Sequence, residues 1–148
     1  MIYLASDHGG FEFKQEIKSW LLESGHECTD LGVNELNPID DYPDFVIPLA
    51  QKIALEERSL GIIFGRSGNG EAITANKVKG VRAVLCFNEK MAQMARTHNN
   101  ANILSLGADY LPMGEAKKII TTFLETEFIG EERHVRRLQK IKDLENGR

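Results

Sequence analysis

The sequence is poor in cysteine and contains only Cys28 and Cys86. Two distant thiols, with no second pair at metal-ligand spacing, exclude a disulfide framework and indicate no zinc or other metal site. We expect both thiols to be buried. Long apolar runs are also absent, since no stretch approaches the roughly 20 residues of a membrane-spanning helix. The opening residues carry no charged-then-apolar signal pattern, so we expect a cytoplasmic protein with no membrane contact.

An excess of positive charge is missing as well. The 18 Lys and Arg residues against 22 Asp and Glu residues give a formal net charge of -4. This balance disfavours nucleic acid as a partner, and the short basic run from Arg133 to Arg137 suits a small anion better. The 148 residues, 42% of them hydrophobic and 27% charged, are typical of one globular unit. We therefore predict a single domain over residues 1–148.

Short apolar runs alternate with stretches of helical periodicity. Runs of strand length cover residues 2–5, 26–31, 60–64, 81–86 and 102–106. After the first run, an apolar stripe at Phe13, Ile17, Leu21 and Leu22 predicts a helix that Gly25 ends. A second helix is expected around residues 45–55. Such alternation is typical of a parallel sheet covered on both faces, so the sequence predicts an α/β fold with five parallel strands.

Three polar or glycine-rich segments follow predicted strands, at residues 7–10, 65–71 and 107–109. In open parallel sheets, ligands bind beyond the carboxyl ends of the strands, where loops lead into helix N-termini. We therefore expect these three segments to cluster in space and to form the binding site.

The segment from Gly65 to Glu71 has three glycines in its first six residues. Glycines allow several N–H groups to turn inward, and a following helix adds its dipole, so the loop could hold an anion or an oxyanion. It matches neither a Walker loop nor a dinucleotide fingerprint, and a plain tight turn is the alternative. Glu71 is either a helix-capping carboxylate or a general base beside a bound substrate.

The pair Asp7-His8 comes directly off the first predicted strand. It is either a helix cap or, because His8 lies beside an acid and before two glycines, a carrier of protons or a phosphate binder. His98 and Asn99 end the fourth helix, where a cation would also suit the helix dipole. Local sequence leaves both interpretations open for each pair.

The last helix is expected over residues 131–145 and has only a weak apolar set, Val135, Leu138, Ile141 and Leu144. A partner subunit could complete its burial. Arg133 and Arg137 lie one helical turn apart and could close on one phosphate. The alternative is a solvated face with ion pairs to the neighbouring glutamates.

Taken together, these motifs resemble type B ribose-5-phosphate isomerases over nearly the whole chain. The resemblance is carried, in order, by Ser6 to Phe11, Asp41 to Asp44, Gly65 to Glu71, Ala75 to Lys77, Gly80 to Ala83, His98 to Asn102 and Arg133-His134. It implies a three-layer α/β/α Rossmann-like domain and a homodimer, or a tetramer of such dimers. The active sites would be shared between subunits, and the C-terminal helix would pack on the partner.

The resemblance further implies an aldose–ketose isomerase that acts through a cis-enediolate and needs no cofactor. His98, aided by Asp7, would open the furanose ring. Glu71 would then move the proton between C2 and C1, while the Ser67 hydroxyl handles the proton between O1 and O2. Backbone N–H groups of the glycine loop, including those of Gly68, Asn69 and Gly70, would hold the enediolate oxygen. Asn99 would orient a hydroxyl.

The family has two branches, which differ in the base. One branch uses a cysteine at the position of Gly65, and the other uses a glutamate at the position of Glu71, which places this chain in the glutamate branch. The resemblance assigns the sugar and phosphate end of the site to a further set of side chains: His8, Tyr42, Arg133 and Arg137.

Two positions depart from the family pattern. Relatives have a phosphate-binding arginine where this chain has Asp109, and they commonly have glycine where it has Arg66. Arg66 could replace the lost positive charge from another direction. The resemblance implies ribose 5-phosphate as the preferred substrate. If Arg66 does not compensate, the expected alternatives are a different placement of the phosphate or another sugar, a tetrose or hexose phosphate. A subunit related to galactose-6-phosphate isomerase and a non-catalytic sugar-phosphate binding module are the other hypotheses.

Overall fold

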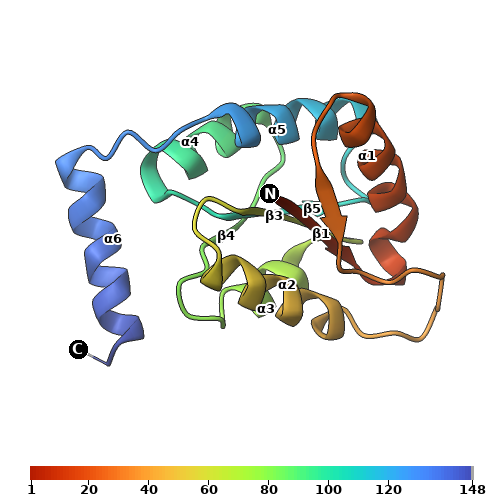
Figure 1. The fold of residues 1–148 in the computed structure, drawn as a ribbon, viewed down its shortest axis with the longest axis horizontal. Coiled ribbons are helices and arrows are strands. Elements are labelled where there is room, and N and C mark those ends of the chain that lie inside the picture. Colours follow the sequence, from red (N-terminus) through yellow and green to blue (C-terminus); the bar gives the residue numbers. More distant parts are fainter. Residues whose placement is uncertain (148) are drawn as a thin grey trace.

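The computed structural model of the chain describes residues 1–147 and contains one five-stranded sheet (Figure 1). Its strands are β1 (Ile2–Ser6), β2 (Cys28–Asp30), β3 (Leu60–Gly65), β4 (Ala83–Leu85) and β5 (Ile103–Gly107). They lie in the order β2-β1-β3-β5-β4, and every pairing is parallel. The prediction of an α/β fold with five parallel strands is confirmed.

Helices cover both faces of this sheet (Figure 1). On one face lie α1 (Phe11–Glu23), α4 (Glu89–Asn99) and α5 (Met113–Glu125), and on the other lie α2 (Pro43–Leu55) and α3 (Asn69–Ala75). Neighbouring strand residues point to opposite faces, so Ile62 belongs to the core under α1, α4 and α5 while Ile63 belongs to the core under α2 and α3. The three-layer α/β/α arrangement is thereby confirmed.

Both edge strands are shorter than the sequence predicted. The runs at 26–31 and 81–86 form strands only over Cys28–Asp30 and Ala83–Leu85. Within the described sheet, each edge strand pairs with one neighbouring strand and over three residues only, so both ends of each apolar run lie outside the paired segment. The same edge position corrects the prediction for Cys28, whose thiol is half-buried, whereas Cys86 is buried as expected.

The buried stripe of α1 differs from the predicted one in two residues. Ile17 and Leu21 are fully buried, but Leu22 is 53% exposed, and Lys14 takes a place in the stripe with no exposed surface. Lys14 Nζ donates to Asp30 Oδ1 at 2.8 Å and to the Val33 carbonyl at 2.9 Å. These bonds make burial of the ammonium group tolerable and tie the chain after β2 to α1. As predicted, Gly25 ends the helix, with φ of +84°.

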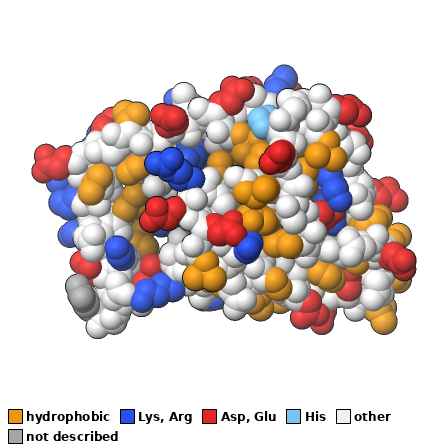
Figure 2. Space-filling model, in the orientation of Figure 1, with side chains coloured by type: hydrophobic (Ala, Val, Ile, Leu, Met, Phe, Trp, Pro, Cys, Tyr) orange, Lys and Arg blue, Asp and Glu red, His pale blue; other side chains and the backbone are white. Residues whose placement is uncertain are grey.

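The last helix, α6 (Glu132–Glu145), lies to one side of the sheet and its covering helices (Figure 1), and contacts them near its two ends, where His134 stacks on His98 and Glu145 accepts the N–H of Gly80. A groove separates it from α2, and its wall on the α6 side includes Val135, Leu138 and Ile141. Figure 2 shows hydrophobic side chains gathered along this groove. Leu144 is 75% exposed on the same helix. The apolar set of α6 is therefore left largely uncovered by its own chain.

Among residues 1–147, no helix is both long enough and apolar enough to cross a bilayer.

Candidate active site

The three segments predicted to cluster do meet at the carboxyl edge of the sheet. The N–H of Ala108 donates to the carbonyl of Gly65 at 2.8 Å, and the N–H of Asp109 donates to the carbonyl of Arg66 at 3.0 Å. Gly9, after β1, lies so close to Arg66 that an added Cβ would be 2.6 Å from Arg66 Cγ. The loops after β1, β3 and β5 therefore form one continuous surface, and this prediction is confirmed.

The glycine loop turns sharply between β3 and α3. Gly68 precedes the first residue of α3 with φ of +81°, a conformation that favours glycine. Its carbonyl accepts a hydrogen bond of 2.7 Å from the buried Ser105 hydroxyl, which anchors the turn to β5. Ser67 Oγ accepts a hydrogen bond of 3.2 Å from the N–H of Asn69, so this amide already has a partner before any substrate arrives.

Glu71 lies in the first turn of α3 but is not a surface cap, because its residue is only 4% exposed. Its carboxylate occupies the space over Gly65, where an added Cβ would collide with both carboxylate oxygens. Burial raises the pKa of Glu71, the charge of Asp7 raises it further, and the residue's own backbone N–H opposes the shift. A buried carboxylate with a raised pKa is the form expected of a general base at a carbon acid.

Tyr42 and Asp7 line the site from two further segments. The ring of Tyr42 packs against Gly70, where an added Cβ would be 2.6 Å from Tyr42 Cζ. Asp7 is buried, and its Oδ1 accepts a hydrogen bond of 2.9 Å from the N–H of Gly9 at the start of the short 3-10 helix η1 (His8–Gly10). The cap interpretation of Asp7 is therefore correct for one of its oxygens.

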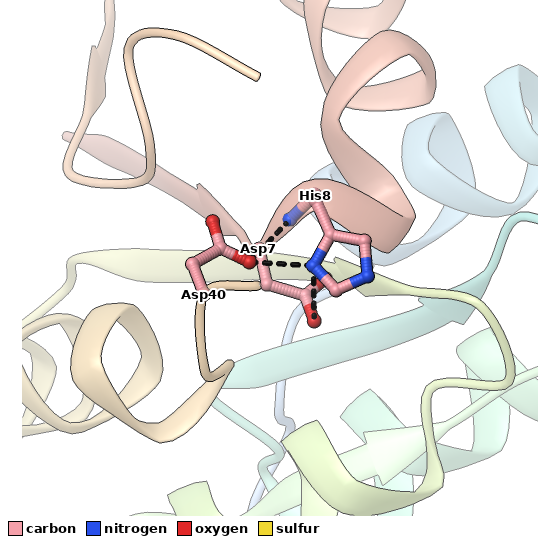
Figure 3. Close-up of side chains that lie close together, drawn as sticks. All are labelled: Asp7, His8 and Asp40. Carbon is pink, nitrogen blue, oxygen red and sulfur yellow. Dashed lines mark hydrogen bonds and ion pairs between the residues drawn. The ribbon is translucent and has the colours of Figure 1, made fainter. Parts of the chain in front are cut away.

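His8 makes its closest contacts with Asp40, a residue that sequence reasoning missed (Figure 3). Asp40 Oδ1 lies 2.6 Å from His8 Nδ1 and accepts the backbone N–H of His8 at 3.0 Å. The hydrogen bond with Asp40 raises the pKa of His8, and burial opposes this shift. No periodic or motif signal pointed to Asp40, because the bond joins an irregular loop to a residue 32 positions earlier.

Asp7, His8 and Asp40 form a cluster of potential metal ligands, in which one ligand atom from each residue lies within 4.8 Å of the others. Tetrahedral ligands about 2.0 Å from a zinc ion would lie about 3.3 Å apart. The 2.6 Å between His8 Nδ1 and Asp40 Oδ1 is shorter and fits a shared proton. The arrangement suits hydrogen bonding better than metal binding.

Arg66 and Asp109, the two departures from the family pattern, lie against each other. Arg66 Nε donates to Asp109 Oδ2 at 3.2 Å, and their side chains are 72% and 50% exposed. A pair this exposed contributes little to stability. It does place a guanidinium group at the mouth of the site, partly neutralised by the carboxylate.

The remaining predicted residues form a second group on α4 and α6. The rings of His98 and His134 stack with centroids 4.4 Å apart and an interplanar angle of 14°. His134 is only 3% exposed, and its Nε2 has no hydrogen-bond partner among residues 1–147. Burial and the charge of His98 lower the pKa of His134. The sequence motif that carries the family resemblance includes His134, but His134 was not predicted as a site residue.

Arg133 and Arg137 of α6 were predicted either to bind one phosphate together or to form ion pairs on a solvated face. Arg133 Nε donates to Glu131 Oε2 at 3.0 Å, and both side chains are about half exposed. This is the ion pair that the solvated-face alternative predicted. Arg137, one turn later, is also exposed, so both guanidinium groups remain accessible to a ligand.

The two groups lie at opposite edges of the sheet within one chain. Helix α4 joins β4 to β5, so it begins at the carboxyl edge and ends, at Asn99, beside the amino edge. Gly65 pairs with Gly107 at the other end of β5, four residues after Ile103, a span of about 13 Å at about 3.3 Å per residue. A single chain therefore does not bring His98 and Asn99 to Asp7 or Glu71.

Comparison with known proteins places this geometry in a family. Residues 2–141 match the model described as Ribose/Galactose Isomerase. Ribose-5-phosphate isomerase B of Mycolicibacterium paratuberculosis is 42% identical over 144 residues, which are 97% of this chain and 91% of that protein. The structure of ribose-5-phosphate isomerase B from Clostridium thermocellum superposes with a TM-score of 0.93 at 42% identity, covering 99% of this chain and 97% of that one.

A second solved structure, ribose-5-phosphate isomerase B from Mycoplasma genitalium with bound ribulose-5-phosphate, also has a TM-score of 0.93. It is 41% identical and covers 98% of this chain and 95% of that one. Agreement of sequence and structure over nearly the full length of each protein leads to one conclusion: the chain belongs to the ribose/galactose isomerase family.

Proposed function

We propose that this protein is an aldose–ketose isomerase that interconverts ribose 5-phosphate and ribulose 5-phosphate without a metal or nucleotide cofactor. The observation that carries the proposal is the buried Glu71 carboxylate over Gly65, beside the glycine loop. Ribulose-5-phosphate bound to the Mycoplasma genitalium relative supports a pentose phosphate as substrate.

The reaction follows from the positions of three groups. Glu71 takes the proton from C2 of the open-chain aldose and returns it at C1, so one carboxylate serves both carbons. The Ser67 hydroxyl moves a proton between O1 and O2 of the cis-enediolate. Backbone N–H groups of Gly68 and Gly70 stabilise the enediolate oxygen, and each such donor contributes about 3 kcal/mol in comparable sites.

Burial of Glu71 fits this chemistry energetically. Desolvation raises the pKa of its carboxyl group, so the protonated intermediate state of the base costs less than it would in water. The proton held by Glu71 is also shielded from exchange with solvent because the residue is 4% exposed. Both effects favour return of the same proton to the neighbouring carbon.

A homodimer completes the site in this proposal. His98 and Asn99 lie at the amino edge of the sheet, away from Glu71, so a second copy must supply them for ring opening and for orienting a hydroxyl. A two-fold axis closes two such sites at once, because each chain gives one edge and receives the other. The uncovered apolar side chains of α6 supply surface for the contact. A tetramer of such dimers is compatible with the same contact.

The phosphate end is assigned to His8 of one copy together with Arg133 and Arg137 of the second copy, because these arginines belong to the group on α4 and α6, and Tyr42 lies against the sugar. Arg66 lies at the mouth of the site, where its pair with Asp109 reduces the net positive charge. That pair favours one second candidate function, isomerisation of another sugar phosphate. A non-catalytic binding module is disfavoured, because a buried carboxylate beside the anion loop would repel its ligand.

The partner and location expected from the sequence stay part of the proposal. The protein would bind a small sugar phosphate, and would act in the cytoplasm without a nucleic-acid or membrane partner.

The test is conversion of ribose 5-phosphate to ribulose 5-phosphate in the presence of EDTA, together with tetrose and hexose phosphates. Glu71→Gln should lower kcat by about 10²- to 10⁴-fold while ligand binding persists. Glu115→Gln is the matched control, since Glu115 occupies the first turn of α5 and is exposed. If only another sugar phosphate is converted, the reaction type stands and that sugar phosphate is the substrate. If none is converted, the proposal of an isomerase is refuted.

A further inference from the structure

Asp40 is a buried acid that the proposed reaction does not yet use. It lies between β2 and α2, and its side chain is only 7% exposed. A single oxygen, Oδ1, accepts the backbone N–H of His8 at 3.0 Å and lies 2.6 Å from the ring nitrogen Nδ1 (Figure 3). Its other oxygen, Oδ2, is buried and has no hydrogen-bond partner among residues 1–147, so the two bonds with His8 are what offset the cost of burying the Asp40 carboxylate.

The two bonds fix His8 in different ways. The backbone bond holds the residue in place, and the ring bond fixes the rotation of the imidazole and places a proton on Nδ1. Nε2 then becomes the ring nitrogen that is free for another partner, and it points away from Asp40 (Figure 3). The side chain of His8 is 31% exposed, so a ligand in the site can reach it.

The charges around His8 come from three segments. Asp40 contributes most to the raised pKa, and Asp7, whose Oδ2 lies 3.8 Å from Nδ1, adds to it. Arg66, from the loop after β3, and burial of the ring act in the opposite direction. The two carboxylates outweigh the guanidinium group and burial, so the ring carries more positive charge near neutral pH than an ordinary histidine.

We propose that Asp40 is a positioning residue that holds His8 as an imidazolium with its Nε2–H directed to the anionic end of the substrate. The inference rests on the proposed function, in which His8 binds the sugar phosphate. Asp40 acts through His8 and touches no substrate atom. Its contribution is therefore to binding, and the proton transfers of Glu71 and Ser67 do not depend on it.

Asp40→Asn separates charge from geometry. The amide oxygen of Asn accepts both His8 bonds, so the orientation is kept while the negative charge is lost. Asp40→Ala loses both the negative charge and the two bonds that orient His8. Asp44→Asn is the matched control, because Asp44 is exposed in the first turn of α2 and makes no contact with His8 among the described interactions. Circular dichroism and thermal unfolding verify that each variant is folded.

Two measurements test the proposal. The first is the NMR titration of His8, assigned with His8→Gln, in which Asp40→Asn should lower its pKa. The second is kcat and KM for ribose 5-phosphate from acid to alkaline pH. The ratio of KM in Asp40→Asn to KM in the wild type should be near one at acid pH, where both rings are charged. It should rise with pH, to about tenfold for each unit of difference between the two pKa values, with kcat unchanged.

Ionisation of the substrate phosphate cancels in this ratio, because both enzymes use the same ligand. Asp40→Ala should raise KM at every pH, since it also loses the orientation. A KM ratio that does not change with pH, an unchanged pKa of His8, or a fall confined to kcat would overturn the proposal. If no sugar phosphate is converted, the isomerase is refuted, but the same titrations with inorganic phosphate still test Asp40. Tighter phosphate binding by the wild type than by Asp40→Asn at neutral pH would then support the Asp40 role, and equal binding would overturn it.

Discussion

Assembly of the site from two chains is best tested by mixing two defective ones. Glu71→Gln disables the carboxyl-edge group and His98→Asn disables the amino-edge group, which lies about 13 Å or more away along the sheet. Each homodimer then has a defect in both of its sites, and its turnover should be about 10²- to 10⁴-fold below the wild type. In the heterodimer, one site carries both substitutions and the other carries neither.

The expected activity of the heterodimer follows from its having one intact site out of two. A heterodimer isolated by two different affinity tags after co-expression should have about half of the wild-type kcat per dimer, because one of its two sites is intact. The matched control is a heterodimer of Glu71→Gln and Ser67→Ala. Both of these residues lie in the same group, so every site keeps one defect and no activity should return. A heterodimer of Glu71→Gln and His98→Asn as inactive as its parents would refute the shared site, as would sedimentation of the wild type as a monomer.

Three further predictions concern buried groups. Gly65→Ala should lower kcat by at least about 10²-fold and cost about 1–3 kcal/mol in unfolding free energy, measured by kinetics and urea denaturation, because the new methyl group displaces the Glu71 carboxylate. Lys14→Met should lower the unfolding free energy by about 3–5 kcal/mol in the same assay, because the buried Asp30 carboxylate loses its ammonium partner at 2.8 Å. Lys18→Met should cost much less, because the Lys18 side chain is partly exposed and lies 3.4 Å from Asp30. Glu71→Gln should raise Tm at neutral pH. The raised pKa of Glu71 means that the native state binds more protons than the unfolded state, so wild-type stability falls as pH rises above about 4.5, and the advantage of the variant should vanish below that pH.

The sheet and most of its helices were predictable because their signals are local. Continuous apolar runs such as Ile62 and Ile63 mark strands buried on both faces, and a glycine with positive φ marks the end of α1. The errors occur where a partner distant in sequence decides the outcome. Lys14 is buried because Asp30 lies beside it, and Leu22 is exposed because, within residues 1–147, neither core cluster includes it.

In the candidate site, too, local sequence signals were predictable, and contacts between residues distant in sequence were not. Glycine spacing and strand order predicted the cluster of loops around Glu71, and the space over Gly65 agrees with the predicted branch of the family. Asp40 was missed because its bond to His8 spans 32 residues and starts in a loop without periodicity. The stack of His98 on His134 was missed for a related reason, since it depends on the path of the chain between α5 and α6.

The separation of the two groups follows from the fold itself. In a parallel sheet, each connecting helix begins at the carboxyl edge and ends at the amino edge, so a residue at the end of α4 cannot meet the loop after β3 of the same chain. Catalysis that needs both Glu71 and His98 therefore requires a second chain. The proposed dimer would also cover the weak apolar set of α6, which the described residues of its own chain leave largely exposed. Substitutions in α6 that prevent dimer formation should abolish ring opening while leaving the buried Glu71 carboxylate in place.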